Sequence, residues 1–183
     1  MIICPTHIPD LLTINFEPIN DFRGSFIRSF CFNEMANAGI TFDIAQTNVS
    51  TNYKSGTLRG LHYQGEPKPE SKIITCTRGA IFDVIVDLRE SSPTFCQWFS
   101  KELTYDNNIA LCVPPGCAHG FITLEDNSVV NYLMNEFYNE DLSLGVRWDD
   151  PNFSIKWPRK PLVISERDAS YPDFYHNQNS TNI

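Results

Sequence analysis

Residues 72–88 of the chain read KIITCTRGAIFDVIVDL, which is two apolar runs separated by Gly79. Short runs rich in isoleucine and valine, joined by a turn residue, are typical of two neighbouring β-strands. Successive side chains of a strand point to opposite faces, so Asp83 shares a face with Ile81 and Ile85. This stretch therefore predicts two successive strands, the second of which carries an ionisable group among core residues.

Short strand-like runs continue in both directions from this pair. Strands are expected at 12–17, 24–30, 44–51, 57–63, 71–78, 80–88, 96–103, 109–113, 118–123 and 129–137. Turn-forming residues separate them, and the one expected helix spans 32–38, with Asn33 as its cap and Gly39 at its end. Many short strands with almost no helix predict an all-β sandwich or barrel.

Length and composition narrow the class of protein. With 183 residues, of which 42% are hydrophobic, the chain is expected to form one domain over residues 1–175, followed by a polar, frayed tail at 176–183. A net charge of −8 argues against nucleic acid and anionic membranes as partners. Its apolar runs are too short to span a bilayer and its first residues do not resemble a signal peptide, so a cytoplasmic protein is expected. The six cysteines form no C-x-x-C pair and are expected to be free, buried thiols.

Four residues of the predicted strands are chemically out of place among apolar neighbours. Lys72 and Asp83 lie in the quoted stretch, and His62 and Tyr132 lie in two other strands. Taken singly, each is more often a solvated or hydrogen-bonded residue without a chemical role. Together they supply a cation, a carboxylate, a base and a phenol, which are the groups that move a proton beside a carbonyl.

Several motifs, in order along the chain, resemble one enzyme family. They are DFRGSF (21–26), GTLRGLHYQ (56–64), DVIVDLR (83–89), SPTF (92–95), PPGCAHGF (114–121), WDDP (148–151), IKWP (155–158) and SERD (165–168). Their order and spacing resemble the dTDP-4-dehydrorhamnose 3,5-epimerase family. The resemblance implies a cupin-type jelly-roll β-barrel with a few short helices, usually assembled as a homodimer.

The resemblance also implies a reaction. The family inverts C3, C5 or both in a nucleotide-linked 4-keto-6-deoxy sugar, as in the conversion of dTDP-4-dehydro-6-deoxyglucose to dTDP-4-dehydrorhamnose, and it uses neither a metal nor another cofactor. Such sugars serve deoxysugar biosynthesis, including that of lipopolysaccharide O-antigen. The 4-keto group acidifies the C3 and C5 protons, so a base can form an enolate and an acid can reprotonate it from the other face. The sequence leaves open whether one centre or both invert.

The catalytic roles of the family correspond to residues of this chain. His62 matches the base, Asp168 matches the carboxylate that orients it, and Tyr132 matches the acid on the opposite face. Lys72 matches the cation beside the enolate oxygen. Asp83 is expected to hold Lys72 in place.

A second group of residues is implied to bind the nucleotide sugar. The group consists of Arg23, Phe26, Arg28, Gln46, Asn48, Arg59, Lys72, His119, Tyr138 and Arg167. Tyr138 matches the ring that stacks on the base, with ordinary core packing as the alternative. Arg59 and His62 are three residues apart, which an ideal strand would place on opposite faces, so Gly60 between them is expected to mark a bulge or a close backbone approach.

The chain departs from the family at three positions. The family often has glutamate where this chain has Arg28 and Ser143, a change of about +3 in local charge. Either Arg28 and Ser143 are positions at the rim of the site that have changed without functional effect, or they indicate a substrate with a different nucleotide or a substituted sugar. Leu133 stands where a lysine is common.

Three other functions remain open from the sequence. A metal-dependent cupin needs more ligands than His62 and His119 provide. A 3,4-ketoisomerase would use similar acid–base groups on the same sugars, and a non-catalytic sugar-nucleotide binding module would need none of them. Metal analysis, product structure and solvent-hydrogen exchange distinguish these three functions.

Overall fold

The structure is a computed structural model that describes residues 1–174, so the tail predicted at 176–183 lies outside the described residues. The strands are β1 (Ile2–Pro5), β2 (Leu12–Asn15), β3 (Ile19–Asp21), β4 (Gly24–Phe26), β5 (Gln46–Asn52), β6 (Leu58–Gln64), β7 (Lys72–Arg78), β8 (Ala80–Asp87), β9 (Trp98–Thr104), β10 (Ile109–Val113), β11 (Cys117–Thr123), β12 (Ser128–Met134) and β13 (Ser143–Gly145). The helices are α1 (Phe32–Asn37), α2 (Glu166–Ala169) and the 3-10 turn η1 (Glu140–Leu142).

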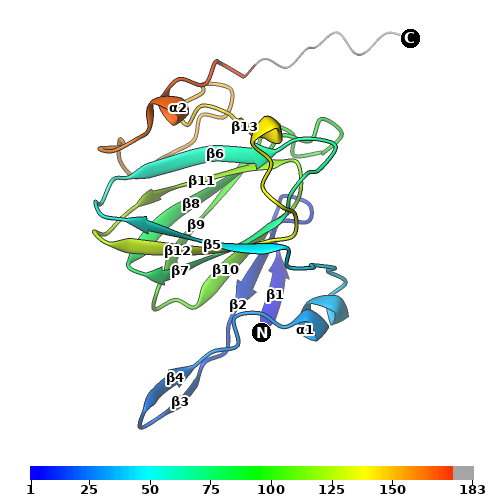
Figure 1. Ribbon diagram of the computed structural model, residues 1–183, viewed down its shortest axis with the longest axis vertical. Coiled ribbons are helices and arrows are strands. Elements are labelled where there is room, and N and C mark those ends of the chain that lie inside the picture. Colours follow the sequence, from blue (N-terminus) through cyan, green and yellow to red (C-terminus); the bar gives the residue numbers. More distant parts are fainter. Residues whose placement is uncertain (175–183) are drawn as a thin grey trace.

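Two antiparallel sheets face each other as the two layers of a barrel (Figure 1). One sheet has six strands in the order β1-β2-β10-β7-β12-β5, and the other has five in the order β13-β6-β11-β8-β9. Most strands that are neighbours in space are distant in the sequence, which is the connectivity of a jelly roll. The all-β jelly-roll barrel with a few short helices is therefore confirmed.

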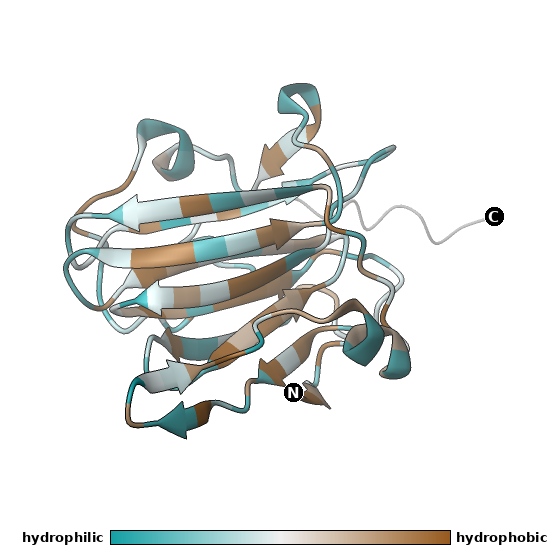
Figure 2. Cartoon of the chain, turned by 60° about the horizontal axis from the view of Figure 1, so that its bottom comes forward, coloured by the Kyte–Doolittle hydropathy of each residue, from teal (hydrophilic) through white to brown (hydrophobic). Residues whose placement is uncertain are grey.

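Alternation along β8 explains how the two layers pack. Ile81 and Ile85 belong to an apolar cluster that draws residues from both sheets, whereas Val84 and Val86 belong to a second cluster on the outer face of the five-stranded sheet. Asp83 is fully buried on the inner side with Ile81 and Ile85, as the alternation predicted. Figure 2 shows the apolar residues as brown bands along the strands of the barrel.

The predicted helix is present as α1, and it covers the outer face of the six-stranded sheet. Met35 of α1 is buried in a third apolar cluster together with Ile73 of β7. The helix begins at Phe32, as predicted, but the prediction of Asn33 as its cap is wrong, because Cys31 occupies the cap position, without a side-chain hydrogen bond. Gly39, with a φ of 78°, follows the last turn as predicted.

Five elements were not predicted from the sequence. They are the short strands β1, β3 and β13, the 3-10 turn η1 and the four-residue helix α2. Elements of three or four residues contain too few side chains to display a period of 2 or of 3.6. Their conformation comes from the neighbours that they contact, so periodicity does not find them.

The cysteines are all free, as predicted. Cys76, Cys112 and Cys117 are buried and the other three are partly buried, so full burial is confirmed for half of them. Burial raises the pKa of Cys112 and of Cys117 to about 12, so both remain neutral thiols that pack as small hydrophobic side chains. Among residues 1–174, no helix has the length and apolar character needed to cross a membrane.

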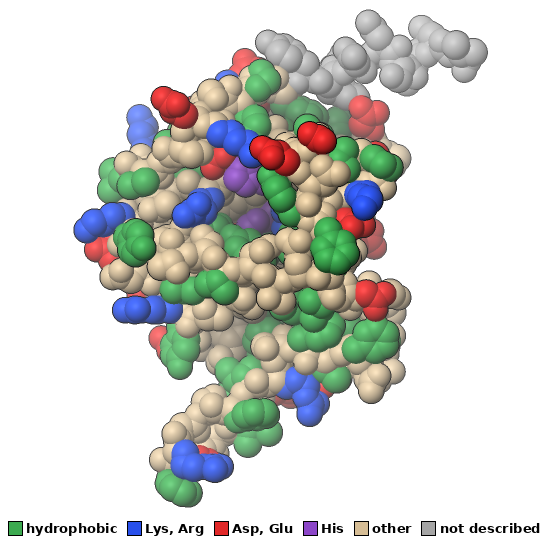
Figure 3. All heavy atoms as spheres, viewed as in Figure 1, with side chains coloured by type: hydrophobic (Ala, Val, Ile, Leu, Met, Phe, Trp, Pro, Cys, Tyr) green, Lys and Arg blue, Asp and Glu red, His purple; other side chains and the backbone are tan. Residues whose placement is uncertain are grey.

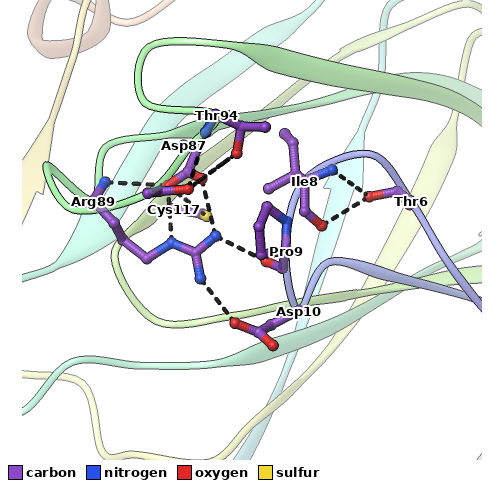
Figure 4. Close-up of polar contacts among 9 residues, drawn as sticks. Thr6, Ile8, Pro9, Asp10, Asp87, Arg89, Thr94 and Cys117 are labelled. Atoms are coloured by element: carbon purple, nitrogen blue, oxygen red, sulfur yellow. Dashed lines mark hydrogen bonds and ion pairs between the residues drawn. The ribbon is translucent and has the colours of Figure 1, made fainter.

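A buried polar network joins the end of β8 to the first loop of the chain (Figure 4). The Asp87 carboxylate accepts hydrogen bonds from Arg89 Nε at 2.8 Å, from Ser92 Oγ at 2.6 Å and from Thr94 Oγ1 at 2.7 Å. Arg89 Nη2 also donates to the Pro9 carbonyl at 2.8 Å. Burial alone would raise the pKa of Asp87, but these hydrogen bonds outweigh it and hold the pKa well below its usual value. The network therefore depends on an ionised Asp87.

Replacing Asp87 by asparagine is expected to lower the free energy of unfolding by about 2–4 kcal/mol at pH 7, since it leaves Arg89 without its buried counter-charge. The folded-state pKa is depressed, so this stabilisation is fully present above the unfolded value of about 3.9 and is lost as the pH falls through the folded value. Urea unfolding of both proteins at pH 7, and at a series of pH values from about 4 downward, measures it. Asp149→Asn, which removes one ion-pair partner that is 49% exposed, is the control and should cost no more than about 1 kcal/mol. Equal losses in the two variants would contradict this role for Asp87.

Candidate active site

A pocket of about 610 Å³ opens between the two sheets. This volume is typical of small-molecule sites. Figure 3 looks into the hollow, where histidine side chains lie deep inside and Lys and Arg side chains lie near the mouth. The predicted site residues that line the pocket are Gln46, Asn48, Arg59, His62, Lys72, His119, Tyr132, Tyr138, Arg167 and Asp168.

A bulge in β6 brings Arg59 and His62 to the same pocket. His62 is paired with His119 of β11, whereas Arg59 is paired with Phe121, so the register shifts by one residue between the two pairs. Side chains three apart can therefore share one face. Gly60 has a φ of 120°, and a Cβ at this position would lie 2.5 Å from a backbone carbon of β11. Both the bulge and the close backbone approach predicted at Gly60 are confirmed.

His62 and Asp168 form a hydrogen-bonded pair in the pocket wall. His62 Nε2 lies 2.7 Å from Asp168 Oδ1, and Asp168 Oδ2 accepts the backbone N–H of Gly60 at 3.1 Å. The Ser165 hydroxyl caps α2 by accepting the backbone N–H of Asp168. This hydrogen bond fixes the backbone position from which the Asp168 side chain extends. Burial alone would raise the pKa of Asp168, but the hydrogen bonds from His62 and Gly60 outweigh it and keep the pKa below its usual value. The ionised carboxylate accepts Nε2–H, which leaves the other ring nitrogen, Nδ1, with a lone pair that can take a proton.

Tyr132 reaches the same pocket from the opposite sheet. It lies on β12 of the six-stranded sheet, whereas His62 lies on β6 of the five-stranded sheet. Burial raises the pKa of Tyr132, the Asp83 carboxylate raises it further, and Arg59 acts in the opposite direction. The phenol is therefore protonated at neutral pH, which is the state that a proton donor requires.

A second, buried His–Asp pair adjoins the pocket, which His119 lines and Asp83 does not. His119 Nε2 lies 2.5 Å from Asp83 Oδ1, and the His119 ring stands edge-on to Tyr132 with the ring centroids 6.0 Å apart. Burial raises the pKa of Asp83, while His119 and Lys72 act against the rise. The expectation that Asp83 holds Lys72 needs correction, because the hydrogen-bonding partner of Asp83 is His119 on the neighbouring strand β11.

Lys72 is paired with Glu70 instead. Lys72 Nζ lies 2.5 Å from Glu70 Oε1, and each side chain is 8% exposed. Glu70 was not predicted from the sequence, because the segment before β7 shows no periodicity. The one available signal was its position two residues before Lys72, since side chains two apart in an extended chain point to the same side.

The mouth of the pocket holds several of the predicted binding residues. Gln46 Oε1 accepts the backbone N–H of Tyr138 at 2.9 Å, and the Tyr138 residue is 57% exposed, so core packing of this ring is ruled out. Arg167 Nη2 donates to the hydroxyl and to the carbonyl oxygen of Ser143, each at 3.0 Å. Ser143 therefore supplies neutral acceptors to a guanidinium at a position where the resemblance implies a carboxylate.

Three predicted binding residues lie outside this pocket. Arg23 and Phe26 belong to the β3–β4 hairpin, which projects away from the barrel (Figure 1); Arg23 pairs with Asp21, and Phe26 is 69% exposed. Arg28 follows the hairpin and pairs with Glu34 at 2.8 Å. Because the hairpin does not fold over the pocket of its own chain, none of the three contributes to it.

Leu133 does not reach the pocket either. It follows Tyr132 on β12, so alternation directs it to the other face of the six-stranded sheet. There it packs against the apolar cluster that contains Ile73 and Ala110. An apolar residue suits this environment, which accounts for Leu133 at this position.

The arrangement favours proton transfer to and from two sides of one bound molecule. An oriented imidazole lies on one sheet, a protonated phenol lies on the other, and Lys72 lines the same pocket. Within residues 1–174, no group of three or more His, Cys, Asp and Glu side chains is placed to hold a metal ion.

Comparison with known sequences identifies the family. The profile of the dTDP-4-dehydrorhamnose 3,5-epimerase family matches residues 5–176. The chain is also 40% identical over 166 residues to a dTDP-4-dehydrorhamnose 3,5-epimerase from Sinorhizobium fredii, covering 90% of this chain and 85% of the relative.

Solved structures show the same fold. A dTDP-4-dehydrorhamnose 3,5-epimerase from Bacillus anthracis with TDP and PPi bound superposes with a TM-score of 0.91 at 40% identity, covering 94% of this chain and 98% of that one. A 3′-monoepimerase from Streptomyces bikiniensis in complex with dTDP-quinovose superposes with a TM-score of 0.87 at 32% identity, covering 92% and 86%. The cupin-type barrel is thereby confirmed. The chain belongs to the dTDP-4-dehydrorhamnose 3,5-epimerase family.

Proposed function

We propose that this epimerase inverts C3, C5 or both in a dTDP-linked 4-keto-6-deoxy sugar. The observation that carries the proposal is the placement of the His62–Asp168 pair and of Tyr132 on facing sheets of one pocket. Inversion requires that a proton leave from one side of the ring and another arrive from the other side. Relatives with TDP or dTDP-quinovose bound support the choice of nucleotide.

In the proposed mechanism, His62 Nδ1 removes the proton on the carbon next to the 4-keto group. The electrons of the broken C–H bond move onto the keto oxygen, and the resulting enolate lies beside the Lys72 ammonium. Asp168 holds the ring in one tautomer and balances the charge of the imidazolium. Tyr132 then gives its hydroxyl proton to the opposite face of the carbon, and exchange with solvent restores both groups.

The proposal is tested by solvent deuterium. In heavy water, dTDP-4-dehydro-6-deoxyglucose should gain deuterium at C3, at C5 or at both, with an inverted configuration seen by NMR, and a UDP- or GDP-linked sugar should react more slowly. An enzyme dialysed against EDTA should retain this activity. Transfer of the ketone to another carbon would favour the 3,4-ketoisomerase, loss of activity that one divalent ion restores would favour the metal-dependent cupin, and binding without exchange would favour the binding module.

Asp168→Asn is expected to reduce kcat by about 10²–10⁴-fold with KM changed little, because the amide no longer holds the His62 ring in its reactive tautomer. Steady-state kinetics on the dTDP-linked sugar measures both constants. Asp149→Asn, at an exposed position that does not line the pocket, is the control. A parent-like kcat would assign Asp168 a structural role only.

We further propose a homodimer in which the β3–β4 hairpin of one copy completes the pocket of the other. The hairpin carries Arg23 and Phe26, which match binding residues of the family yet lie outside the pocket of their own chain. Ile19 and Phe26 are each 69% exposed and Phe22 is 98% exposed, and clustered exposed apolar side chains are typical of an interaction surface. Light scattering should give twice the mass of the chain. A mixture of Arg23→Ala and His62→Ala enzymes should then regain activity that neither has alone, which a monomer could not do.

A cytoplasmic location and a role in deoxysugar biosynthesis, such as that of lipopolysaccharide O-antigen, complete the proposal. Six unpaired cysteines support a reducing compartment. Fractionation of cells that express the protein tests the location, and recovery in the periplasm would contradict it.

A further inference from the structure

The pocket contains one buried carboxylate that the mechanism above does not use. Glu70 is 9% exposed and Lys72 is 6% exposed, and both line the pocket. Their charged groups lie 2.5 Å apart. An ion pair that is buried at both ends is costly to remove from water, so its presence inside a reaction pocket calls for an explanation.

Two other carboxylates in or near the pocket have hydrogen-bonding partners of their own. Asp168, which lines the pocket, binds His62 and the bulge of β6, and the fully buried Asp83 binds His119. Glu70 is thus the carboxylate that forms an ion pair with Lys72, whereas Asp83 acts on Lys72 without a contact. Among the described residues, Lys72 is also the single ion-pair partner of Glu70.

The backbone around Glu70 is held in one conformation. Ser71, which lies between Glu70 and Lys72, exchanges two hydrogen bonds with Asn135: Ser71 N–H donates to Asn135 Oδ1 at 2.6 Å, and Asn135 N–H donates to the Ser71 carbonyl at 3.2 Å. Lys72 itself is paired with Met134 and with the neighbouring strand β10 in the sheet. The carboxylate and the ammonium are therefore presented by a rigid segment rather than by a mobile loop.

We propose that Glu70 is a positioning residue that holds the Lys72 ammonium at one place in the pocket wall, charged and aimed at the developing enolate oxygen; this inference rests on the proposed function. A lysine side chain has four rotatable bonds and samples several rotamers unless an interaction restrains it. An ammonium has three hydrogens, so an ion pair to Glu70 leaves two for the substrate oxygen. The Glu70 carboxylate supplies the counter-charge next to a cation that is buried in the pocket wall.

The first test is Glu70→Gln, which keeps the shape of the side chain and removes its charge. It should lower kcat by roughly 10- to 100-fold, the scale expected when a reacting group is misplaced, with KM within about threefold of the parent. Glu70→Asp keeps the charge at a shorter reach and should recover part of the loss. Glu66→Gln makes the same change at an exposed position of the same segment and should leave kcat unchanged.

The second test asks whether Glu70 acts through Lys72. Lys72→Met should lower kcat, and adding Glu70→Gln to Lys72→Met should lower it no further, because the cation that Glu70 holds is already gone. If the losses of kcat in the two single variants multiplied in the double variant, Glu70 would act independently of Lys72, which would overturn the proposal. So would a parent-like kcat for Glu70→Gln, or a raised KM with kcat unchanged, which would make Glu70 a direct substrate ligand.

Folding and function are separated by two further measurements. The thermal midpoint should fall more for Glu70→Gln than for the double variant, in which no buried charge is left unpaired; if Glu70→Gln does not fold, Glu70→Asp and the double variant carry the comparison. Solvent deuterium exchange by the parent reports on the proposed function. A parent that shows no exchange removes the proposed function and this inference together, whereas normal exchange in both the parent and Glu70→Gln removes this inference alone.

Discussion

A His62→Ala enzyme is expected to incorporate no solvent deuterium into a dTDP-linked 4-keto-6-deoxy sugar. The imidazole is oriented by the buried Asp168 carboxylate and keeps a free ring nitrogen, and unlike the buried His119 side chain it is open to the pocket. Removing it takes away the first step of the reaction, so exchange and epimerisation should stop together. General-base contributions are typically 10²–10⁴-fold, and we expect a loss of at least about 10³-fold because Tyr132 lies on the wrong side to substitute. NMR of the substrate in heavy water measures the exchange.

The loss should not come from unfolding. The His62 side chain is 38% exposed, and Asp168 keeps its hydrogen bond from the Gly60 N–H in the variant. The thermal midpoint should therefore stay near that of the parent. His7→Ala removes an exposed histidine that does not line the pocket and should exchange at the parent rate. Normal exchange by a folded His62→Ala enzyme would remove His62 from the mechanism.

Tyr132→Phe is expected to separate the two halves of the reaction. The change removes one hydroxyl and keeps the ring that packs against the apolar cluster between the sheets, so folding should be preserved. His62 can still form the enolate and return a proton to the same face. Solvent deuterium should therefore enter the substrate with its configuration retained, while formation of the epimer falls by roughly 10²–10⁴-fold. NMR follows label and configuration in one experiment.

Tyr105→Phe is the matched control, because Tyr105 is 65% exposed and does not line the pocket. It should epimerise at the parent rate. A Tyr132→Phe enzyme that epimerises close to the parent rate would falsify the phenol as the acid. A donor elsewhere in the pocket, such as His119, or a water molecule would then have to take its place.

Much of the barrel was predictable from local pattern. A strand repeats its side-chain direction every two residues, so the sequence places Asp83 with Ile81 and Ile85 before any contact is known. The same rule separates Tyr132, which faces the pocket, from Leu133, which packs on the outer face. The strand–turn–strand unit at 72–88 was predictable for the same reason.

Partners of the site residues were harder to predict, because a pattern along one strand does not say which strand lies opposite. Asp83 was assigned to Lys72, yet the sheet places it against β11, where His119 is within reach. Glu70 precedes β7, in a segment without a repeating pattern of polar and apolar residues, so periodicity could not identify it. The position of the β3–β4 hairpin could not be predicted from the sequence either. Its residues match binding residues of the family, yet in the structure they lie outside the pocket of their own chain.

The sequence by itself determined the strand faces, the family motifs and the residue types needed for proton transfer at a carbonyl. The family resemblance implied that Asp168 orients His62 and that Tyr132 acts from the opposite face. Only the tertiary structure decided the contacts themselves, which join His62 to Asp168 across 106 residues of the chain and place Tyr132 on the facing sheet. The physical reason is that side-chain direction follows from backbone geometry within one strand. Distances between strands follow from register, from the Gly60 bulge and from how the two layers close around the core.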